Sequence, residues 1–183
     1  VSGLSAQNKT YDKTTDATLS GTASLVGVET GEAVNLDGTA SGTFDDVNVG
    51  TGINVAVSGL SISGADAANY TLTQPTLSAD INVKPLTVTA DGGQTKVYGA
   101  DDPVSYTYTL TAGSLESGDN FSGALSRDAG ENAGNYAITQ GTLTAGANYD
   151  ITFVSADFVI SPKPLTVTAD GGQTKVYGAD DPV

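Results

Sequence analysis

The stretch from Lys84 to Val104 reads KPLTVTADGGQTKVYGADDPV, and the same 21 residues recur without a change from Lys163 to Val183, 79 positions later. A period near 80 residues suits a whole small domain rather than one rung of a solenoid. The second copy would cover only about a quarter of its module, and the chain starts at Val1 without an initiator methionine. We therefore expect tandem modules taken from a longer repetitive protein.

The repeated stretch alternates with a period of two, which is the signature of a β-strand. Leu86, Val88 and Ala90 alternate with threonines, and the segment 104–110 alternates in the same way. No segment of ten or more residues shows the 3.6-residue period of a helix. The alternation therefore predicts strands throughout the chain.

Turn-forming residues separate these strands, among them Gly92 and Gly93 of the Asp-Gly-Gly sequence in the repeat. Short strands with turns at this spacing favour an all-β fold of tandem small antiparallel modules, sandwich-like in each case. The alternative is a β-grasp-like sheet with one short helix at Ser114–Gly118. The single-turn segment Gly64–Ala68 is the other helical candidate.

The repeat also sets the expected module borders. We predict a first module over residues 1–83, a second over 84–162, and the truncated start of the next over 163–183. Each border carries Lys-Pro, with Pro85 and Pro164 fixing an extended and stiff backbone. The modules are therefore expected to sit end to end as a rod, with a join that buries little, and residues 163–183 are expected to need a partner strand.

Composition excludes several kinds of function. The net charge is −14, and cysteine and histidine are both absent. Disulfides, thiolate sites and imidazole-based catalysis are thereby excluded, and we expect no enzyme activity. The acidic balance disfavours nucleic acid and anionic membrane surfaces. No run of 18 apolar residues occurs, so no membrane insertion is expected.

Tyrosines are the most prominent candidate residues. We interpret them as structural, because strand periodicity places their rings with valine and isoleucine, while a sugar-stacking role is the alternative. The structural set also includes the turn glycines and border prolines, and comprises Tyr11, Tyr70, Tyr98, Tyr149, Gly92, Gly93, Pro85 and Pro164. Tyr106 and Tyr108 share one strand face and are the candidate ligand-facing aromatics.

Two further chemistries are weak candidates. Asp101 and Asp102 could contribute to a Ca²⁺ site near a border, although neither EF-hand spacing nor a calcium-binding repeat is present, and solvated turn aspartates are the commoner explanation. Lys96 could form an isopeptide bond with Asn135 or Asn148; otherwise it points to water. No cofactor is expected beyond this possible Ca²⁺.

The motifs resemble two bacterial repeat families. Lys-Pro-Leu-Thr-Val at the start of residues 84–162, with Tyr98-Gly99-Ala100 inside, resembles the MBG domain of the Tyr-Gly-X type. Tyr11-Asp12 in residues 1–83 resembles the YDG domain, although Lys13 stands where that family has glycine. The resemblance implies long surface adhesins and filamentous-haemagglutinin-like proteins, an extracellular cell-attached setting, and a role in adhesion or biofilm. It implies no catalytic residues.

These observations favour a structural extender, or stalk, that holds a binding tip away from the cell. The rival is a module that binds glycan or protein weakly and gains avidity by repetition. Expected partners are neighbouring repeats of the same chain, and a host or environmental glycan or protein reached through other parts of the parent.

Overall fold

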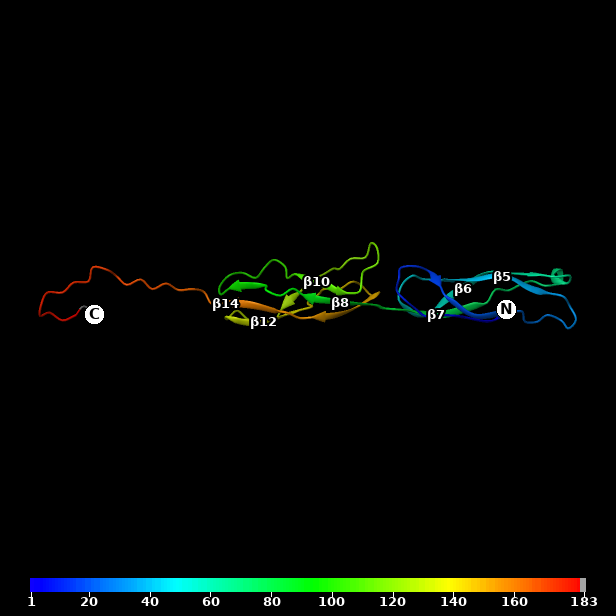
Figure 1. Ribbon diagram of the computed structural model, residues 1–183, viewed down its shortest axis with the longest axis horizontal. Helices are drawn as coiled ribbons and strands as arrows, with labels where there is room; N and C mark the ends of the chain where they lie inside the picture. Colours follow the sequence, from blue (N-terminus) through cyan, green and yellow to red (C-terminus); the bar gives the residue numbers. More distant parts are fainter. Residues whose placement is uncertain (182–183) are drawn as a thin grey trace.

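The computed structural model describes residues 1–181 as two β modules in line, followed by an extended C-terminal stretch (Figure 1). The predicted all-β fold is confirmed, with small curled sheets in both modules. Strand β7 of the first module ends at Asn82 and strand β8 of the second begins at Lys84. A single residue, Val83, therefore lies between the two modules.

The first module folds as two sheets. Its strands are β1 (Ser2–Ala6), β2 (Lys9–Thr10), β3 (Asp16–Ala17), β4 (Leu19–Ser24), β5 (Asn35–Phe44), β6 (Gly50–Ser63) and β7 (Thr76–Asn82). Strands β1 and β4 form a two-stranded sheet, and the other five form a sheet of order β2-β7-β6-β5-β3. A glycine bulge interrupts each sheet, at Gly3 and at Gly38, where φ is 87° and 89°. These bulges let the strands curl over one another.

The second module also has two sheets. Its strands are β8 (Lys84–Ala90), β9 (Thr95–Val97), β10 (Tyr108–Ala112), β11 (Ser126–Arg127), β12 (Gly134–Thr139), β13 (Tyr149–Val154) and β14 (Asp157–Ser161). They pair in the orders β10-β8-β13 and β11-β12-β14-β9. The chain passes from one sheet to the other at every connection except that between β11 and β12, and the first crossing, between β8 and β9, is at Gly92–Gly93.

The expectation of purely antiparallel sheets is wrong at three pairs. Strands β2 and β7, β8 and β13, and β9 and β14 pair in parallel. In both modules these parallel pairs join the start of the module to its end. The chain therefore enters the second module at the end that faces the first module and leaves it at the opposite end, as the path of the ribbon in Figure 1 shows.

Two apolar clusters fill the molecule. One lies inside the second module and includes Val88, Ile138 and Phe158, all fully buried. The other begins in the first module with Phe44 and Ile81 and continues into the second module. The second cluster therefore occupies the join rather than the middle of either module.

Neither helical candidate forms an α-helix. Ser114–Gly118 is a loop ending in a turn closed by the Asp119 amide on the Glu116 carbonyl, at 3.0 Å, so the β-grasp alternative is wrong. Gly118 takes a φ of 85°, which interrupts a right-handed helix. A single 3₁₀ turn, η1 (Ala67–Asn69), overlaps the other candidate. Within residues 1–181 no helix is long and apolar enough to cross a membrane.

The C-terminal stretch repeats the second module's first strands in sequence but not in structure. Leu86 and Val88 are buried, at 1% and 0% exposure, whereas the identical Leu165 and Val167 are 88% and 94% exposed. Residues 162–181 form no strand and extend away from the modules (Figure 1). The same residues thus form no strand where no strands equivalent to β10 and β13 lie beside them.

This contrast predicts a difference in amide hydrogen exchange. Residues 87–90 lie in β8, between β10 and β13, whereas residues 166–169 lie in the extended stretch. Their intrinsic exchange rates match because their sequences match. We expect slow exchange for the first set and nearly unprotected exchange for the second, by residue-resolved NMR. Equal protection of the two sets would contradict the described fold.

Candidate functional site at the join between the modules

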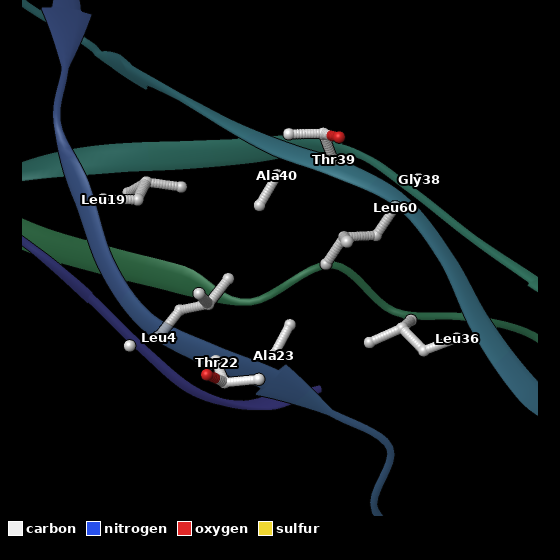
Figure 2. Close-up of a pocket in the computed structure, with 10 residues that line it drawn as sticks. Leu4, Leu19, Thr22, Ala23, Leu36, Gly38, Thr39, Ala40 and Leu60 are labelled. Carbon is white, nitrogen blue, oxygen red and sulfur yellow. The ribbon is translucent and has the colours of Figure 1, made fainter.

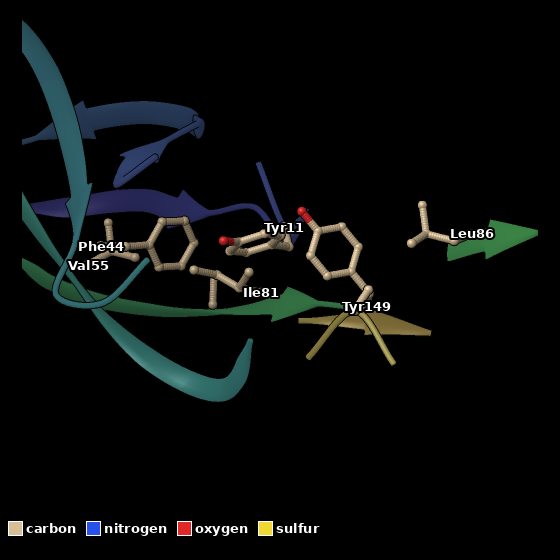
Figure 3. Close-up of a cluster of buried hydrophobic side chains, with 8 residues drawn as sticks. Tyr11, Phe44, Val55, Ile81, Leu86 and Tyr149 are labelled. Atoms are coloured by element: carbon tan, nitrogen blue, oxygen red, sulfur yellow. The ribbon is translucent and has the colours of Figure 1, made fainter. Parts of the chain in front are cut away.

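The join is built around two tyrosines, one from each module. Tyr11 follows β2 of the first module, and Tyr149 opens β13 of the second. Their rings meet edge to face with centroids 5.4 Å apart, and both are buried. Figure 3 shows them between Phe44 and Ile81 on one side and Leu86 on the other. This buried aromatic contact fixes one module against the other.

A single carboxylate receives both phenols. The Tyr11 hydroxyl donates to Asp119 Oδ2 at 3.0 Å, and the Tyr149 hydroxyl donates to the same atom at 2.7 Å. The other carboxylate oxygen, Oδ1, accepts from Lys13 Nζ at 2.6 Å. Asp119 thus satisfies two buried hydroxyls, which would otherwise be costly, and binds a cation of the first module.

Lys13 stands at the position where the YDG motif has glycine, and its backbone conformation is one that favours glycine. Its φ is 61°, the only positive φ of a non-glycine residue among residues 1–181. This region is disfavoured for a side chain. The lysine Nζ donates to the Ser117 carbonyl at 2.8 Å as well as to Asp119. The strained lysine is thereby compensated by contacts to the other module.

A second set of cross-join bonds lies around Asn148. Its Oδ1 accepts from the Val49 amide at 3.0 Å, and its Nδ2 donates to Asn48 Oδ1 at 2.9 Å. The Asn148 carbonyl accepts from the Lys84 amide at 2.9 Å within the second module. The loop that precedes Tyr149 is therefore held on both sides of the border.

The expectation that the join buries little is wrong. One apolar cluster runs across it, with Tyr11, Phe44 and Ile81 from the first module and Leu86 and Tyr149 from the second. A change at Pro85, which is exposed, would act beside this shared core rather than in a bare linker. Sequence could not show this, because Tyr11 and Asp119 are 108 positions apart.

Ionisation equilibria respond to this packing. Burial and then the hydrogen bond to Asp119 raise the pKa of Tyr11. Burial, with a further contribution from Asp119, raises the pKa of Tyr149 to about 12. The hydrogen bonds from Lys13 and then Tyr149 lower the pKa of Asp119. At neutral pH the join therefore holds two neutral phenols on one ionised carboxylate.

The other residues expected to be structural are placed as follows. Gly92 and Gly93 form the bend between β8 and β9, where Gly93 has a φ of 79°. Tyr70 lies at the far end of the first module, where its hydroxyl accepts from the Glu29 amide at 3.0 Å and donates to Glu32. Tyr98 is half exposed and Pro164 is exposed.

Asp102 is committed to an ion network rather than free for calcium. Its Oδ1 contacts Lys96 Nζ at 2.7 Å and Arg127 Nη2 at 3.0 Å, and its Oδ2 accepts from Arg127 Nε and the Tyr106 hydroxyl, both at 2.8 Å. Two cations therefore already neutralise this carboxylate, and Asp101 is exposed beside it. No cluster of three metal-ligating side chains occurs in the described part of the chain.

The contacts of Lys96 in this network argue against the isopeptide hypothesis. Lys96 is buried and bonds Asp102 and Glu131, neither of them the asparagine partner considered from sequence. The hydrogen bonds that Lys96 donates to these carboxylates raise the pKa of Lys96, and the hydrogen bonds donated by Arg127 and Lys96 lower the pKa of Asp102. The amine is held charged, which removes the lone pair that an amide-forming attack needs. Asn148 instead serves the join.

Tyr106 and Tyr108 pack against the core of the second module. Tyr106 meets Phe158 edge to face at 5.5 Å, and Tyr108 meets Phe121 in the same way at 5.6 Å. Both rings are partly buried. They do not present a flat open face side by side, and a ligand-facing role for them stays a prediction.

A hollow lies in the first module, between the β1–β4 sheet and strands β5 and β6. It has a volume of about 410 Å³, and Leu4, Ala23, Ala40 and Leu60 point into it (Figure 2). Its lining is aliphatic, with threonine hydroxyls and no titratable side chain. The hollow therefore combines aliphatic side chains with polar backbone and hydroxyl groups and offers no acid–base chemistry.

Comparison with known families matches this two-part architecture. Residues 1–77 match the YDG domain, and residues 86–159 match the MBG domain of the YGX type. The chain is a YDG–MBG tandem. Searches of curated proteins and of solved structures gave no match. YDG and MBG domains are found in adhesin-like surface proteins.

Sequence reasoning identified Tyr11 and Tyr149 in the YDG and MBG domains, but it did not assign the residues that connect them to the join. Asp119, Lys13 and Asn148 carry the polar contacts of the join. Lys13 did leave a signal, because a lysine replaces the motif glycine. Asp119 left none, since one aspartate among many acids has no distinguishing pattern.

Tyr11, which is buried at the join, and Tyr98, which is half exposed, give a matched pair of alanine variants. Tyr11→Ala empties a buried aromatic site and should lower the free energy of unfolding by about 3–5 kcal/mol. Tyr98→Ala removes the same side chain where it is half exposed, and should change it by about 0.5 kcal/mol or less. Urea titrations followed by circular dichroism measure both. Similar losses would contradict a special role for the join.

The pKa shifts predict how the join responds to pH. Asp119 has a lowered pKa, so its contribution is present above its ordinary 3.8 and lost as pH falls through the folded value. Tyr149 has a raised pKa, so its contribution is present below 10.0 and lost as pH rises through about 12. The stability advantage of the native chain over Asp119→Asn should shrink in acid, and that over Tyr149→Phe in alkali. Urea titrations across pH measure both, and pH-independent differences would refute the assignment.

Proposed function

We propose that the YDG–MBG tandem is a stalk segment of a bacterial surface adhesin, which holds a binding region away from the cell. The observation that carries this proposal is the buried join, in which two tyrosines share one carboxylate across the border. A stalk needs length and resistance to bending, and both follow from how these modules are connected.

Length follows from the parallel pairing of an early strand of each module with its last strand, β2 with β7 and β9 with β14. Because the chain enters the second module at one end and leaves it at the other, a module added after it would extend the molecule instead of folding back. Resistance to bending follows from the join, since bending would separate Tyr11 from Tyr149 and expose apolar surface. The single-residue spacing at Val83 leaves no slack to absorb such motion.

An extracellular setting on the bacterial surface belongs to the same proposal. The occurrence of both domain types in adhesin-like surface proteins supports it. Fourteen net negative charges keep such a module hydrated and separated from acidic neighbours. No catalytic activity is proposed, and adhesion or biofilm formation would depend on other parts of the parent.

The rival proposal is weak, multivalent binding of glycan or protein by the modules themselves. It requires an open recognition face, and Tyr106 and Tyr108 are engaged edge-on with core phenylalanines. A glycan array probed with the two-module protein separates the two. Binding that Tyr106→Ala or Tyr108→Ala abolishes would favour the rival.

Stiffness can be measured with paired spin labels. Because the chain has no cysteine, Thr30→Cys and Ser105→Cys label only the two far ends, at exposed positions. Pulsed electron spin resonance should give one narrow distance distribution. Asp119→Ala should broaden it, because two phenols and Lys13 lose their shared acceptor.

The control for this experiment is Asp150→Ala, which removes a neighbouring exposed carboxylate next to Tyr149 but leaves Asp119 in place. It should keep the distribution narrow. A broad distribution in the unmutated protein would overturn the stalk proposal, since modules that move independently cannot hold a tip at a distance.

A further inference from the structure

The far end of the MBG module carries an exposed hollow of about 360 Å³. Its lining residues, which we call the distal face, are Tyr98, Asn132, Ala133, Pro162, Lys163 and Leu165. Tyr98 is 48% exposed and Leu165 is 88% exposed. An aromatic ring and a leucine left open at the end of a module need an explanation, and the existing join supplies one.

Strand register places Tyr98 where the first module has Tyr11. In the first module Thr10 lies opposite Asn82, and the Tyr11 amide donates to the Asn82 carbonyl at 2.9 Å. In the second module Val97 lies opposite Ser161, and the Tyr98 amide donates to the Ser161 carbonyl at 2.8 Å. The two tyrosines therefore follow the same parallel strand pair at the same step.

The remaining members of the distal face correspond in the same way. Asn132-Ala133 echoes Asn48-Val49, the pair that holds Asn148 across the present join. Pro162, Lys163 and Leu165 stand where Val83, Lys84 and Leu86 stand at the first border. Each residue of the distal face thus has a counterpart at the existing join.

The module that covers Tyr11 at the existing join indicates what would occupy the distal face. Tyr11 is covered by the near end of an MBG module, through Tyr149, Asp119 and Asn148. After Pro162 the chain repeats the opening 21 residues of that same module. We propose that the distal face is the docking surface for a second MBG module in the same chain, beginning at Lys163.

In this arrangement Tyr98 contacts the incoming counterpart of Tyr149 and donates to the counterpart of Asp119. Leu165 becomes buried as Leu86 is now. One contact is lost, because Ala100 stands where Lys13 supplies its ammonium to Asp119. The MBG–MBG join is therefore expected to use the tyrosine pair without the ion pair. This inference deepens the stalk proposal and rests on it for its biological meaning.

The test uses residues 1–183 followed directly by a copy of residues 105–162. This completes a second MBG module, since residues 163–183 already repeat residues 84–104. Nitrogen-15 relaxation should give one common tumbling time for all three modules. Tyr98→Ala should release the last module to a shorter tumbling time, without unfolding it, because Tyr98 is half exposed in the shorter chain.

Tyr177→Ala in the same extended chain is the matched control. Tyr177 occupies the position of Tyr98 in the added module, where no further module follows, so its removal should leave the tumbling times unchanged. An independently tumbling last module in the unmutated chain would overturn the inference, as would equal effects of the two substitutions.

Two other occupants of the distal face are separated by the same samples. Dimerisation of the extended chain in light scattering, abolished by Tyr98→Ala, would assign the face to a second molecule and overturn the proposal. Glycan binding abolished by Tyr98→Ala would do the same. A rigid first join with a mobile second join would refute this inference alone and leave the stalk proposal standing.

Discussion

The parallel pairing of each module's opening strands with its closing strands is the constraint on which the molecule depends. Strand β2 runs alongside β7, and β9 runs alongside β14. If these pairs were antiparallel, the chain would return to the end at which it entered, and consecutive modules would lie side by side. Because they are parallel, the closing strand delivers the chain to the far end, beside the tyrosine that follows the opening strand. The same pairing thus sets the direction of growth and builds the surface for the next module.

Burying tyrosine at that surface brings a requirement that leucine would not. A buried phenol needs a hydrogen-bond acceptor, and two phenols here share Oδ2 of Asp119. The acceptor, Asp119, lies in the loop between β10 and β11 of the second module. The Tyr11 hydroxyl can therefore reach its hydrogen-bond acceptor only when the two modules are correctly aligned. Apolar packing supplies attraction at the join, whereas the shared carboxylate specifies the angle.

Much of the fold could be predicted from the sequence, because alternating threonine and aliphatic residues leave little choice but strands. The repeat indicated the module length, and Tyr11 and Tyr149 were recognised as structural. The pairing directions could not be predicted, since a strand with both faces covered looks the same in either direction. The loop at Ser114–Gly118 was misjudged because Gly118 takes a left-handed φ of 85°. Contacts such as that of Tyr11 with Asp119 cannot be predicted from one sequence, because nothing in the local sequence around either residue identifies its partner.

The two copies of KPLTVTADGGQTKVYGADDPV show how far local sequence determines structure in this chain. The first copy contains strands β8 and β9, with Leu86 and Val88 buried, whereas the second copy is extended and exposed. Only the strands around them differ. A module that depends so strongly on its own later strands gains stability from a neighbour that covers its open end.

The residue two positions after Tyr11 or Tyr98 then determines how firmly the neighbouring module is held. Lys13 adds a charged contact at the cost of a disfavoured φ of 61°, and Ala100 provides no charge. Stiffness along such an array can therefore be graded one join at a time, without altering the modules themselves.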